Sequence, residues 1–320
     1  MDRLVVFADR RIGFAMRLAR AAIEAARRSP DVEVVALVDA TGRGAPSELM
    51  VAARRIGIGL LGRLAGGRGP GAGESLKRLA RRHGVPLVVP PRHDVNDERV
   101  AEHLARRLGA TLALSVGCLA IFRSPLLSTF DVVVNYHDGA LPHYRGLGAT
   151  AWSIYRGEQQ SGFTFHRMVE RIDAGAILVQ GAVPIAPDAT GAQVSRLKTQ
   201  AAAAAMPVVL AKMVARDPGT EQPAGGRYFS GRDRRALITI EDPAAVDWPD
   251  LQQRLRAFGR LVMTLDGRRW DVTALERIED GRPRPLAFVT RDGVAAMPVR
   301  FSDLPRWLYL ATRPFAGRSR

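Results

Sequence analysis

The chain has 320 residues, of which 47 % are hydrophobic and 25 % are charged, values typical of a soluble globular protein with one large or two medium domains. Its single cysteine, Cys118, excludes an internal disulfide and any zinc site built from cysteines. No run of about 18 apolar residues could span a membrane, and the apolar N-terminal run is too short for a secretory signal, so we expect a cytoplasmic protein.

The formal net charge is +15, and 44 of the 47 basic residues are arginines, since the lysines are only Lys77, Lys198 and Lys212. The arginines are spread along the chain, without the dense tract that is typical of a nucleic-acid-binding arm. Two interpretations stay open. The excess is either a bias toward arginine in the source genome, or a means of attracting an anionic partner such as a nucleotide, a nucleic acid, a polyglutamylated cofactor or an acidic protein.

The first half of the chain alternates between short apolar runs and segments with helical periodicity. We expect strands at 4–8, 32–38, 85–90, 111–117 and 132–137, and helices at 12–28, 74–84 and 96–109. This alternation predicts an α/β fold with a doubly wound, mostly parallel sheet, in which functional groups gather at the carboxyl ends of strands.

The loops of this half lack two common nucleotide-binding patterns. The first strand is followed by "ADRRIG" (8–13), which has no GxGxxG, and the glycine-rich stretch 66–75 has no GK[ST]. We therefore expect neither a Rossmann dinucleotide site nor a P-loop. Residues 40–73 read as one long loop with a single helix at 47–57, and loops of this length are often functional.

The pattern changes after residue 190. A long helix is expected at 191–216, followed by a Pro-, Gly- and charge-rich linker at 217–235. Short strand-like runs then occur at 236–240, 260–265, 269–275, 286–290 and 294–299, with Asp-Gly turn signals at 266–267, 280–281 and 292–293. The sequence thus predicts an α/β domain at 1–190, a helix and linker at 191–235, and a small, mostly β, OB-like domain at 236–320.

The stretch "NYHDGALPHYRG" (135–146) places polar groups directly at the end of a buried strand. Because residues two apart share one face of a strand, Asn135 and His137 should point the same way and Tyr136 the other way. An amide can donate to a developing oxyanion, and an imidazole can move a proton at neutral pH. This pair suits acyl transfer, and Asp173, which follows another apparent strand, could orient the histidine.

The residues alone leave two other interpretations of this pair. Asn135 and His137 could be a satisfied structural pair at a strand end. Alternatively, His137 and His143 could join a metal site with Asp138 or Asp173, although their spacing fits no helical metal motif.

The run from 135 to 180 carries a longer pattern: Asn-x-His, a loop ending in Leu-Pro, then Arg-Gly, a Gly-Phe-Thr-x-His-x-Met strand and Asp-x-Gly-x-Ile. In this chain the pattern occupies Asn135, His137, Leu141–Pro142, Arg145–Gly146, 162–168 and 173–177. It resembles the folate-dependent formyltransferases, which include glycinamide ribonucleotide, methionyl-tRNA and sugar-nucleotide formyltransferases. Weaker resemblance covers 1 to about 190, and 251–258 is similar to the start of the C-terminal β domain of these enzymes.

The resemblance implies a formyltransferase catalytic domain at 1–190 with Asn135, His137 and Asp173 as catalytic residues. It implies 10-formyltetrahydrofolate as donor and no metal. The attacking amine would be neutral, Asn135 and protonated His137 would stabilise the charge on the formyl oxygen, and Asp173 would favour the charged imidazole. The folate-binding residues implied by the resemblance are Gly117, Leu119, Gly139, Leu141, Pro142, Glu170 and Ile172.

The acceptor is less defined. The loop "DGALPHYRGLGATAW" departs from the "SLLPRWRGAAP" typical of methionyl-tRNA enzymes, so we expect a small amine, a sugar nucleotide or a carrier-bound amine and no membrane partner. A tRNA acceptor and a 10-formyltetrahydrofolate hydrolase that uses water are the alternatives. His166 is expected either to pack beside the site or to contact it. Trp152 and Trp248 are expected in the core, and no role is assigned to His83, His93 and His103.

Overall fold

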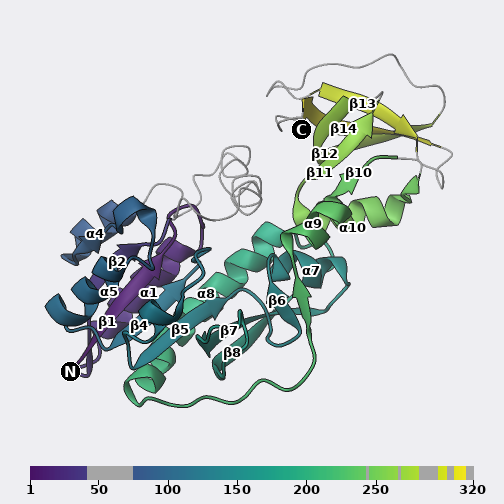
Figure 1. Ribbon diagram of the computed structural model, residues 1–320. Coiled ribbons are helices and arrows are strands. Elements are labelled where there is room, and N and C mark those ends of the chain that lie inside the picture. The colour runs from purple at the N-terminus through teal and green to yellow at the C-terminus, as the bar shows by residue number, and fades with distance from the viewer. Residues whose placement is uncertain (42–74, 243–244, 266–267, 281–294, 301–305, 315–320) are drawn as a thin grey trace.

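The computed structural model describes residues 1–41, 75–242, 245–265, 268–280, 295–300 and 306–314. These residues form a seven-stranded sheet, a five-stranded sheet and a two-stranded sheet, and Figure 1 shows most of the helices packed around the first of these. The long loop expected at 40–73, apart from its first two residues, lies outside the described residues. So do the strand expected at 286–290 and the Asp-Gly pairs at 266–267 and 292–293.

The seven-stranded sheet has the order β3-β2-β1-β4-β5-β7-β8. The first five strands are parallel, whereas β7 runs antiparallel to both of its neighbours. The predicted doubly wound, mostly parallel sheet is therefore confirmed. The strands are β1 (Asp2–Ala8), β2 (Val32–Asp39), β3 (Leu87–Val88), β4 (Leu112–Val116), β5 (Val132–His137), β7 (Gln160–Arg167) and β8 (Ile177–Pro184).

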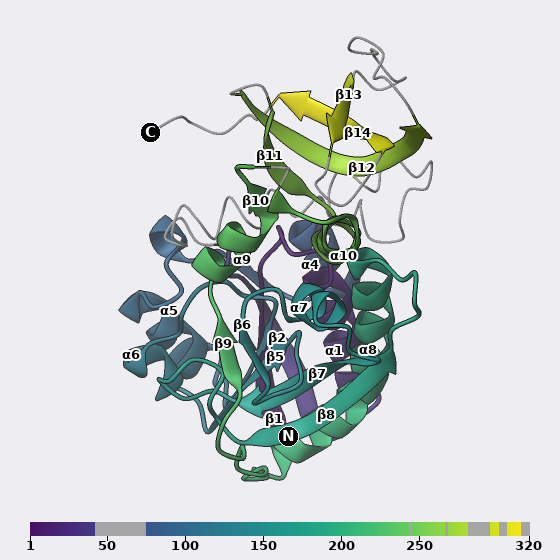
Figure 2. The ribbon, with the colours of Figure 1, turned by 90° about the vertical axis from the view of Figure 1, so that its right-hand side faces the viewer.

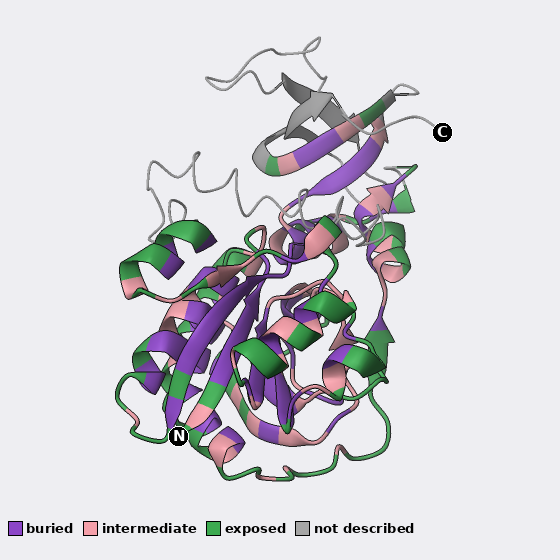
Figure 3. Cartoon of the chain, turned by 60° about the vertical axis from the view of Figure 1, so that its left-hand side comes forward, coloured by how far each residue is buried: buried purple, intermediate pink, exposed green. Residues whose placement is uncertain are grey.

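Helices cover both faces of this sheet, and its strands are the buried layer in Figure 3. An apolar cluster lies on each face of the sheet, and alternate residues of β1 contribute to them in turn. Leu4 and Val6 belong to the first cluster, and Val5 and Phe7 belong to the second. The first cluster also takes side chains from α1 (Ala15–Ala26), α4 (Leu76–His83) and α8 (Gly191–Val214). The second takes them from α5 (Glu98–Glu102), the π-helical turn η2 (His103–Arg107) and α6 (Ser124–Leu127).

Strand β3 is much shorter than the run 85–90 that the sequence predicts. Only Leu87 and Val88 pair with β2. Pro86 and Pro90 bracket them, and a proline has no N–H to donate to a sheet ladder. The chain then continues into a short turn of 3₁₀-helix, η1 (Pro91–His93).

Helix α8 is the longest helix of the described chain and confirms the helix expected at 191–216. It begins with a capping box, in which the Thr190 hydroxyl accepts from Gln193 N and the Gln193 side chain accepts from Thr190 N. Its buried residues follow one another mostly at intervals of three or four: they are Val194, Lys198, Thr199, Ala202, Met206, Val209, Leu210 and Met213. Such spacing places one stripe against the sheet and α1.

The stretch 217–235, expected as a linker, contains regular structure. Strand β9 (Arg227–Phe229) pairs in parallel with β6 (Tyr144–Gly146), and Figure 2 shows the two strands side by side. Helices α7 (Ala149–Tyr155) and α9 (Gly231–Ile238) flank them in sequence. The Phe229 ring stacks on Trp152 at 4.6 Å and on Tyr144 at 5.6 Å, so one aromatic residue anchors an otherwise polar, glycine-rich segment.

The C-terminal part forms the second sheet, in the order β10-β11-β12-β14-β13. This confirms a mostly β C-terminal region, while its likeness to an OB barrel and the domain boundaries at 190 and 235 stay predictions. Only the last two residues of the run 236–240 are a strand, because its first three end α9. The elements are β10 (Thr239–Ile240), α10 (Trp248–Phe258), β11 (Leu261–Leu265), β12 (Arg268–Asp280), β13 (Ala295–Arg300) and β14 (Arg306–Pro314).

Among the residues that the structure describes, no helix combines the length and the apolar character needed to cross a bilayer. Trp152 is buried in the cluster that joins α7, α10 and β11, and Trp248 packs against the same cluster. Both tryptophans are therefore core residues, as expected.

Candidate active site

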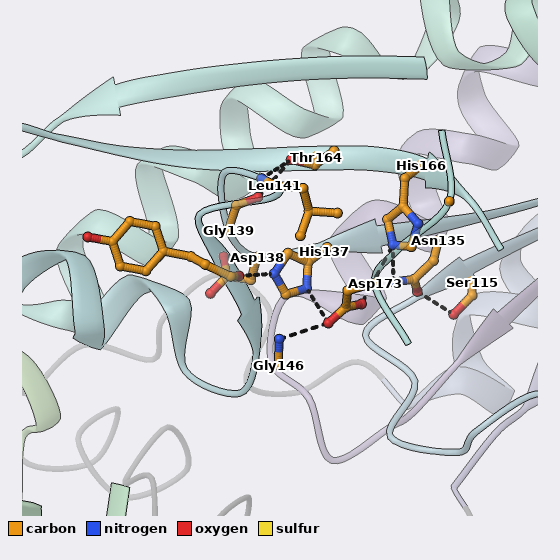
Figure 4. Close-up of polar contacts among 12 residues, drawn as sticks. Ser115, Asn135, His137, Asp138, Gly139, Leu141, Gly146, Thr164, His166 and Asp173 are labelled. Atoms are coloured by element: carbon orange, nitrogen blue, oxygen red, sulfur yellow. Dashed lines mark hydrogen bonds and ion pairs between the residues drawn. The ribbon is translucent and has the colours of Figure 1, made fainter. Parts of the chain in front are cut away.

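The carboxyl end of β5 presents Asn135 and His137 on one face of the sheet, as strand alternation predicts (Figure 4). At the end of the neighbouring β4, the Ser115 hydroxyl donates a hydrogen bond of 2.8 Å to Asn135 Oδ1. Tyr136 points to the other face, where its ring packs against Phe165 at 5.3 Å. Because Ser115 occupies Oδ1, the Asn135 amide is oriented with Nδ2 toward the rest of the site.

Asp173 reaches the same place from the loop between β7 and β8. Its Oδ2 accepts a hydrogen bond of 2.8 Å from Gly146 N and lies 3.6 Å from His137 Nδ1. Its Oδ1 lies 3.7 Å from His166 Nε2. The structure thus brings Asn135, His137 and Asp173 together, and the carboxylate lies between two imidazoles (Figure 4).

A main-chain carbonyl holds the buried His137 ring. His137 Nε2 lies 2.5 Å from Tyr144 O, and because a carbonyl only accepts, Nε2 carries the proton of this hydrogen bond. Nδ1 faces Asp173 on the opposite side of the ring. When the ring is an imidazolium, both of its N–H groups therefore face an acceptor, which suits the charged form that the resemblance implies for catalysis.

His166 contacts the site directly, which decides between the two roles expected for it. Its Nδ1 lies 2.9 Å from Arg167 O and must donate, so Nε2 of the neutral ring is an acceptor, 3.3 Å from Asn135 Nδ2. Burial lowers the pKa of His166 to about 4, and the Asp173 carboxylate only partly opposes this shift. At neutral pH the ring is uncharged and accepts from the Asn135 amide.

The loop after β5 is tied to β7 and β8. Thr164 Oγ1 donates to Gly139 O at 2.7 Å and accepts from Leu141 N at 3.2 Å. Gln180 Nε2 donates to Leu141 O and to Thr164 Oγ1, both at 2.9 Å. The loop therefore has a fixed shape beside the site, and its residues Gly139, Leu141 and Pro142 are buried.

A buried cation lies beneath this loop. Lys198 of α8 is fully buried, and its Nζ donates to Asp138 O at 2.8 Å and lies 2.9 Å from Asp138 Oδ1. Asp138 also accepts from Thr150 Oγ1 at 2.6 Å. Burial lowers the pKa of Lys198, and the Asp138 carboxylate opposes that shift. The pair fixes the residue that directly follows His137.

Sequence reasoning missed Lys198, although a signal was present. The lysine occupies the buried stripe of α8, between Val194 and Ala202. A charged residue on an apolar stripe, in a chain with three lysines and 44 arginines, indicates a buried partner. Thr164 lies within the family motif at 162–168, whereas for Ser115 no comparable signal exists, because its partner Asn135 comes from a neighbouring strand.

The residues expected to contact folate lie in three segments at this end of the sheet. Gly117 and Leu119 follow β4 and are half-buried, while Glu170 and Ile172 are exposed on the loop that carries Asp173. The loop 139–142 lies between these segments in sequence and follows β5 directly. Exposed large apolar side chains in these segments are Ile121 (57 %), Val169 (47 %) and Ile172 (44 %).

The described residues include no group of three or more His, Cys, Asp or Glu side chains that could hold a metal ion. The metal interpretation needed His143 beside His137. In the structure the His143 carbonyl accepts from Arg227 N at 3.3 Å, which places this residue at the start of the β6–β9 pairing.

Comparison with known proteins agrees with this geometry. Residues 76–210, which include Asn135, His137 and Asp173, match the family model of the formyl transferases. A sugar N-formyltransferase from Shewanella sp FDAARGOS_354 is 21 % identical, with a TM-score of 0.57 over 84 % of this chain and 95 % of that chain. A phosphoribosylglycinamide formyltransferase from Anaplasma phagocytophilum is 19 % identical, with a TM-score of 0.52 over 71 % of this chain and 96 % of that chain.

A third structure is the N-formyltransferase from Helicobacter canadensis, in complex with folinic acid and dTDP-3-aminofucose. It is 14 % identical, with a TM-score of 0.58 over 98 % of this chain and 100 % of that chain. The resemblance first indicated by the sequence motifs is thereby confirmed: the chain carries a formyl transferase domain and has the fold of the folate-dependent formyltransferases.

Proposed function

We propose that this protein is an N-formyltransferase that moves a formyl group from 10-formyltetrahydrofolate to a primary amine. The observation that carries the proposal is the convergence of Asn135, His137 and Asp173 at the carboxyl ends of β4 and β5. We propose that the acceptor is a small amine, with a nucleotide-linked amino sugar as the first candidate.

The Asn135 amide is suited to bind a developing oxyanion. Ser115 occupies Oδ1, and His166 accepts one of the two hydrogens on Nδ2. The second Nδ2 hydrogen remains to donate to the formyl oxygen when charge develops there. His166 and Ser115 together would prevent the amide from turning its oxygen toward the substrate.

His137 and Asp173 provide a positive charge beside the formyl oxygen and a path for a proton. As the acceptor nitrogen bonds to the formyl carbon, charge gathers on the formyl oxygen, and the His137 imidazolium stabilises it with the neighbouring carboxylate as counter-charge. The bond between the formyl carbon and folate N10 then breaks. The proton lost by the amine reaches N10 through His137, Asp173 or water, and the products are a formamide and tetrahydrofolate.

The surroundings of the site suit the donor. Ile121 after β4, and Val169 and Ile172 in the loop between β7 and β8, leave apolar surface exposed, and flat heteroaromatic rings bind against such surface. The solved structure from Helicobacter canadensis contains folinic acid, a formylated folate. That observation supports folate as the donor here.

Two further observations support a nucleotide-linked amino sugar as acceptor. The Helicobacter canadensis structure also contains dTDP-3-aminofucose, and another structural match is a sugar 3N-formyltransferase studied with dTDP and 5-N-formyl-THF. The net charge of +15 would attract a nucleoside diphosphate. The same charge would attract any anion, so the sugar is argued from the matched structures.

The direct test is to incubate the protein with 10-formyltetrahydrofolate and a panel of dTDP-amino sugars, free amino acids and methionyl-tRNA, with a control lacking amine. We expect a formamide product with at least one amino sugar and no turnover without amine. Formylation of methionyl-tRNA alone would reject the proposed acceptor. Release of formate in the amine-free control would indicate a hydrolase.

Replacement of Asn135, His137 or Asp173 by Ala should each reduce turnover by about two to four orders of magnitude, because each removes an oxyanion donor or a proton-transfer group. Circular dichroism should show an unchanged fold. Any one of these variants that retained near-wild-type turnover would remove that residue from the mechanism.

A further inference from the structure

The segment that follows α8 runs alongside the loop that carries Asp173. Ile177 N donates to Thr220 O at 2.7 Å, and Thr220 N donates to Ile177 O at 2.8 Å. Figure 1 shows this segment passing along the edge of the molecule beyond β8 before it turns into β9. These two hydrogen bonds bring the next residues of the segment beside the backbone of residues 173–175.

Gln222 holds that backbone through its side chain. Its Nε2 donates to Asp173 O at 2.9 Å and to Gly175 O at 2.8 Å. Both hydrogens of one amide nitrogen are thus used on two carbonyls of the same turn. A clamp of this kind fixes the relative orientation of the two peptide groups.

The turn needs such support. Asp173 has φ of +52°, a left-handed conformation that is uncommon for a residue other than glycine and that costs about 1–3 kcal/mol when the surroundings do not favour it. Gly175 cannot take a side chain, because an added Cβ would lie 1.9 Å from Arg167 O. The loop therefore has an uncommon backbone conformation at Asp173 and is closely packed against Arg167 O two residues later.

The amide of Gln222 has only one satisfactory orientation. Its Oε1 is buried and has no hydrogen-bond partner within the described residues. Turning the amide over would place Oε1 against two carbonyl oxygens and lose both hydrogen bonds. In this orientation Gln222 donates two hydrogen bonds while its Oε1 stays without one. The two donated hydrogen bonds therefore determine the orientation of the amide.

We propose that Gln222 is a positioning residue for Asp173: it holds the backbone of residues 173–175 so that the carboxylate lies beside His137. The inference rests on the proposed function, since Asp173 matters for turnover only if that function holds. The effect passes through the main chain, because both hydrogen bonds of Gln222 Nε2 go to carbonyl oxygens of the turn. The carboxylate already lies 3.6 Å from His137 Nδ1, so a small backbone shift would break this pairing.

The chain offers a matched control in Gln253 of α10. Its Nε2 also donates to the main-chain carbonyls of two consecutive residues, Ile154 O at 2.6 Å and Tyr155 O at 3.2 Å. These carbonyls lie at the end of α7 and not in the loop that carries Asp173. Q222M and Q253M each remove a glutamine of this kind with little change in side-chain length, and Q222E is a second variant in case Q222M fails to fold.

The first readout does not depend on turnover. NMR titration of the His137 ring, assigned with H137N, should show that Q222M and D173N move the titration midpoint in the same direction, while Q253M leaves it unchanged. A midpoint in folded Q222M and Q222E equal to that of the wild type would overturn the inference, whatever the protein catalyses.

The second readout is a double-mutant cycle on formyl transfer. Q222M should lower kcat about tenfold to a hundredfold with little change in either KM. In the D173N background it should lower kcat less than twofold, because the residue it positions has already lost its charge. A full, independent loss in both backgrounds would overturn the inference. An inactive wild type would reject the proposed function only, since the NMR test would still decide the role of Gln222.

Discussion

Gly139 shows how the absence of a side chain shapes the site. A Cβ added at this position would lie 2.6 Å from Ala149 Cβ, 2.7 Å from Tyr144 O and 2.8 Å from His137 Nε2. Real Cβ atoms do not approach other atoms so closely, and two of these neighbours form the hydrogen bond that orients the His137 ring. The glycine is thus required by the packing around His137.

G139A should therefore lower kcat about a hundredfold, because the new methyl group must displace either the His137 ring or the Tyr144 carbonyl. G231A is the control, since its added Cβ would meet only Leu147 Cδ1 at 3.9 Å, an ordinary contact. Steady-state kinetics and thermal melts of both variants measure the effect. Equal activity of the two variants would contradict the packing argument.

His166 should make stability depend on pH. Burial holds the pKa of the folded state near 4, below the ordinary value of 6.5, so the unfolded chain binds more protons between these values. The contribution is fully present above pH 6.5 and is lost as pH falls toward 4. Urea titrations should show that H166Q loses less stability than wild type between pH 7 and pH 5. An identical loss in both proteins would show that His166 is not the titrating group.

At the scale of elements, strand β9 presents its residues to two different environments. Phe229 is 1 % exposed and lies between aromatic rings, whereas Tyr228 is 49 % exposed and lies beside Gly146 and Asp173. Burial, followed by the Asp173 charge, raises the pKa of Tyr228, so its hydroxyl stays protonated at neutral pH and can donate a hydrogen bond. The strand thus has one anchoring residue and one residue that can contact an acceptor.

Variants of these two neighbours should separate stability from binding. F229A should lower the free energy of unfolding by about 3–5 kcal/mol, as expected for a buried aromatic residue. Y228A should change stability by no more than about 0.5 kcal/mol and should raise the acceptor KM with a smaller effect on kcat. Urea titration measures the free energy of unfolding of both variants, and steady-state kinetics measures the acceptor KM and kcat of Y228A. A Y228A variant with an unchanged acceptor KM would remove Tyr228 from the binding surface.

The elements also show where prediction from sequence succeeds. Apolar runs and helical periodicity predicted β4, β5, α1 and α8, and strand alternation predicted that Asn135 and His137 share a face. Asp173 was indicated by its place after another apparent strand and by the family motif, although no local rule shows which loop will reach a strand end. Lys198 could have been recognised from its place on an apolar stripe.

Other contacts could not be predicted. Gln222 lies in a stretch whose prolines and glycines suggested a linker, and its partners are two main-chain carbonyls, which any sequence would supply. The Gly146 N–H that binds Asp173 is equally invisible in the sequence. Main-chain groups carry no residue identity, so only the folded arrangement reveals their part in the site.

At the scale of the whole molecule, the net charge of +15 should make association with an anionic acceptor depend on salt. The Debye length falls from about 10 Å at 0.1 M to about 3 Å at 1 M ionic strength, so added salt weakens long-range attraction. The KM for a nucleotide-linked acceptor should rise with salt, whereas kcat should change little. A KM that is independent of salt would show that the charge plays no part in capturing this substrate.

The clamp on Asp173 has a consequence for the order of folding. The sheet strands β1, β2 and β4 can pair before the chain beyond α8 is in place, but the Asp173 turn depends on Gln222, and Gly146 depends on its pairing with Phe229. Because the turn at 173–175 and strand β6 are themselves placed by the neighbouring sheet strands β5, β7 and β8, we expect the contacts that Gln222 and Phe229 make with them to form after the sheet. A refolding chain should therefore regain its helices and most of its sheet while still inactive, and catalysis should be the last native property to return.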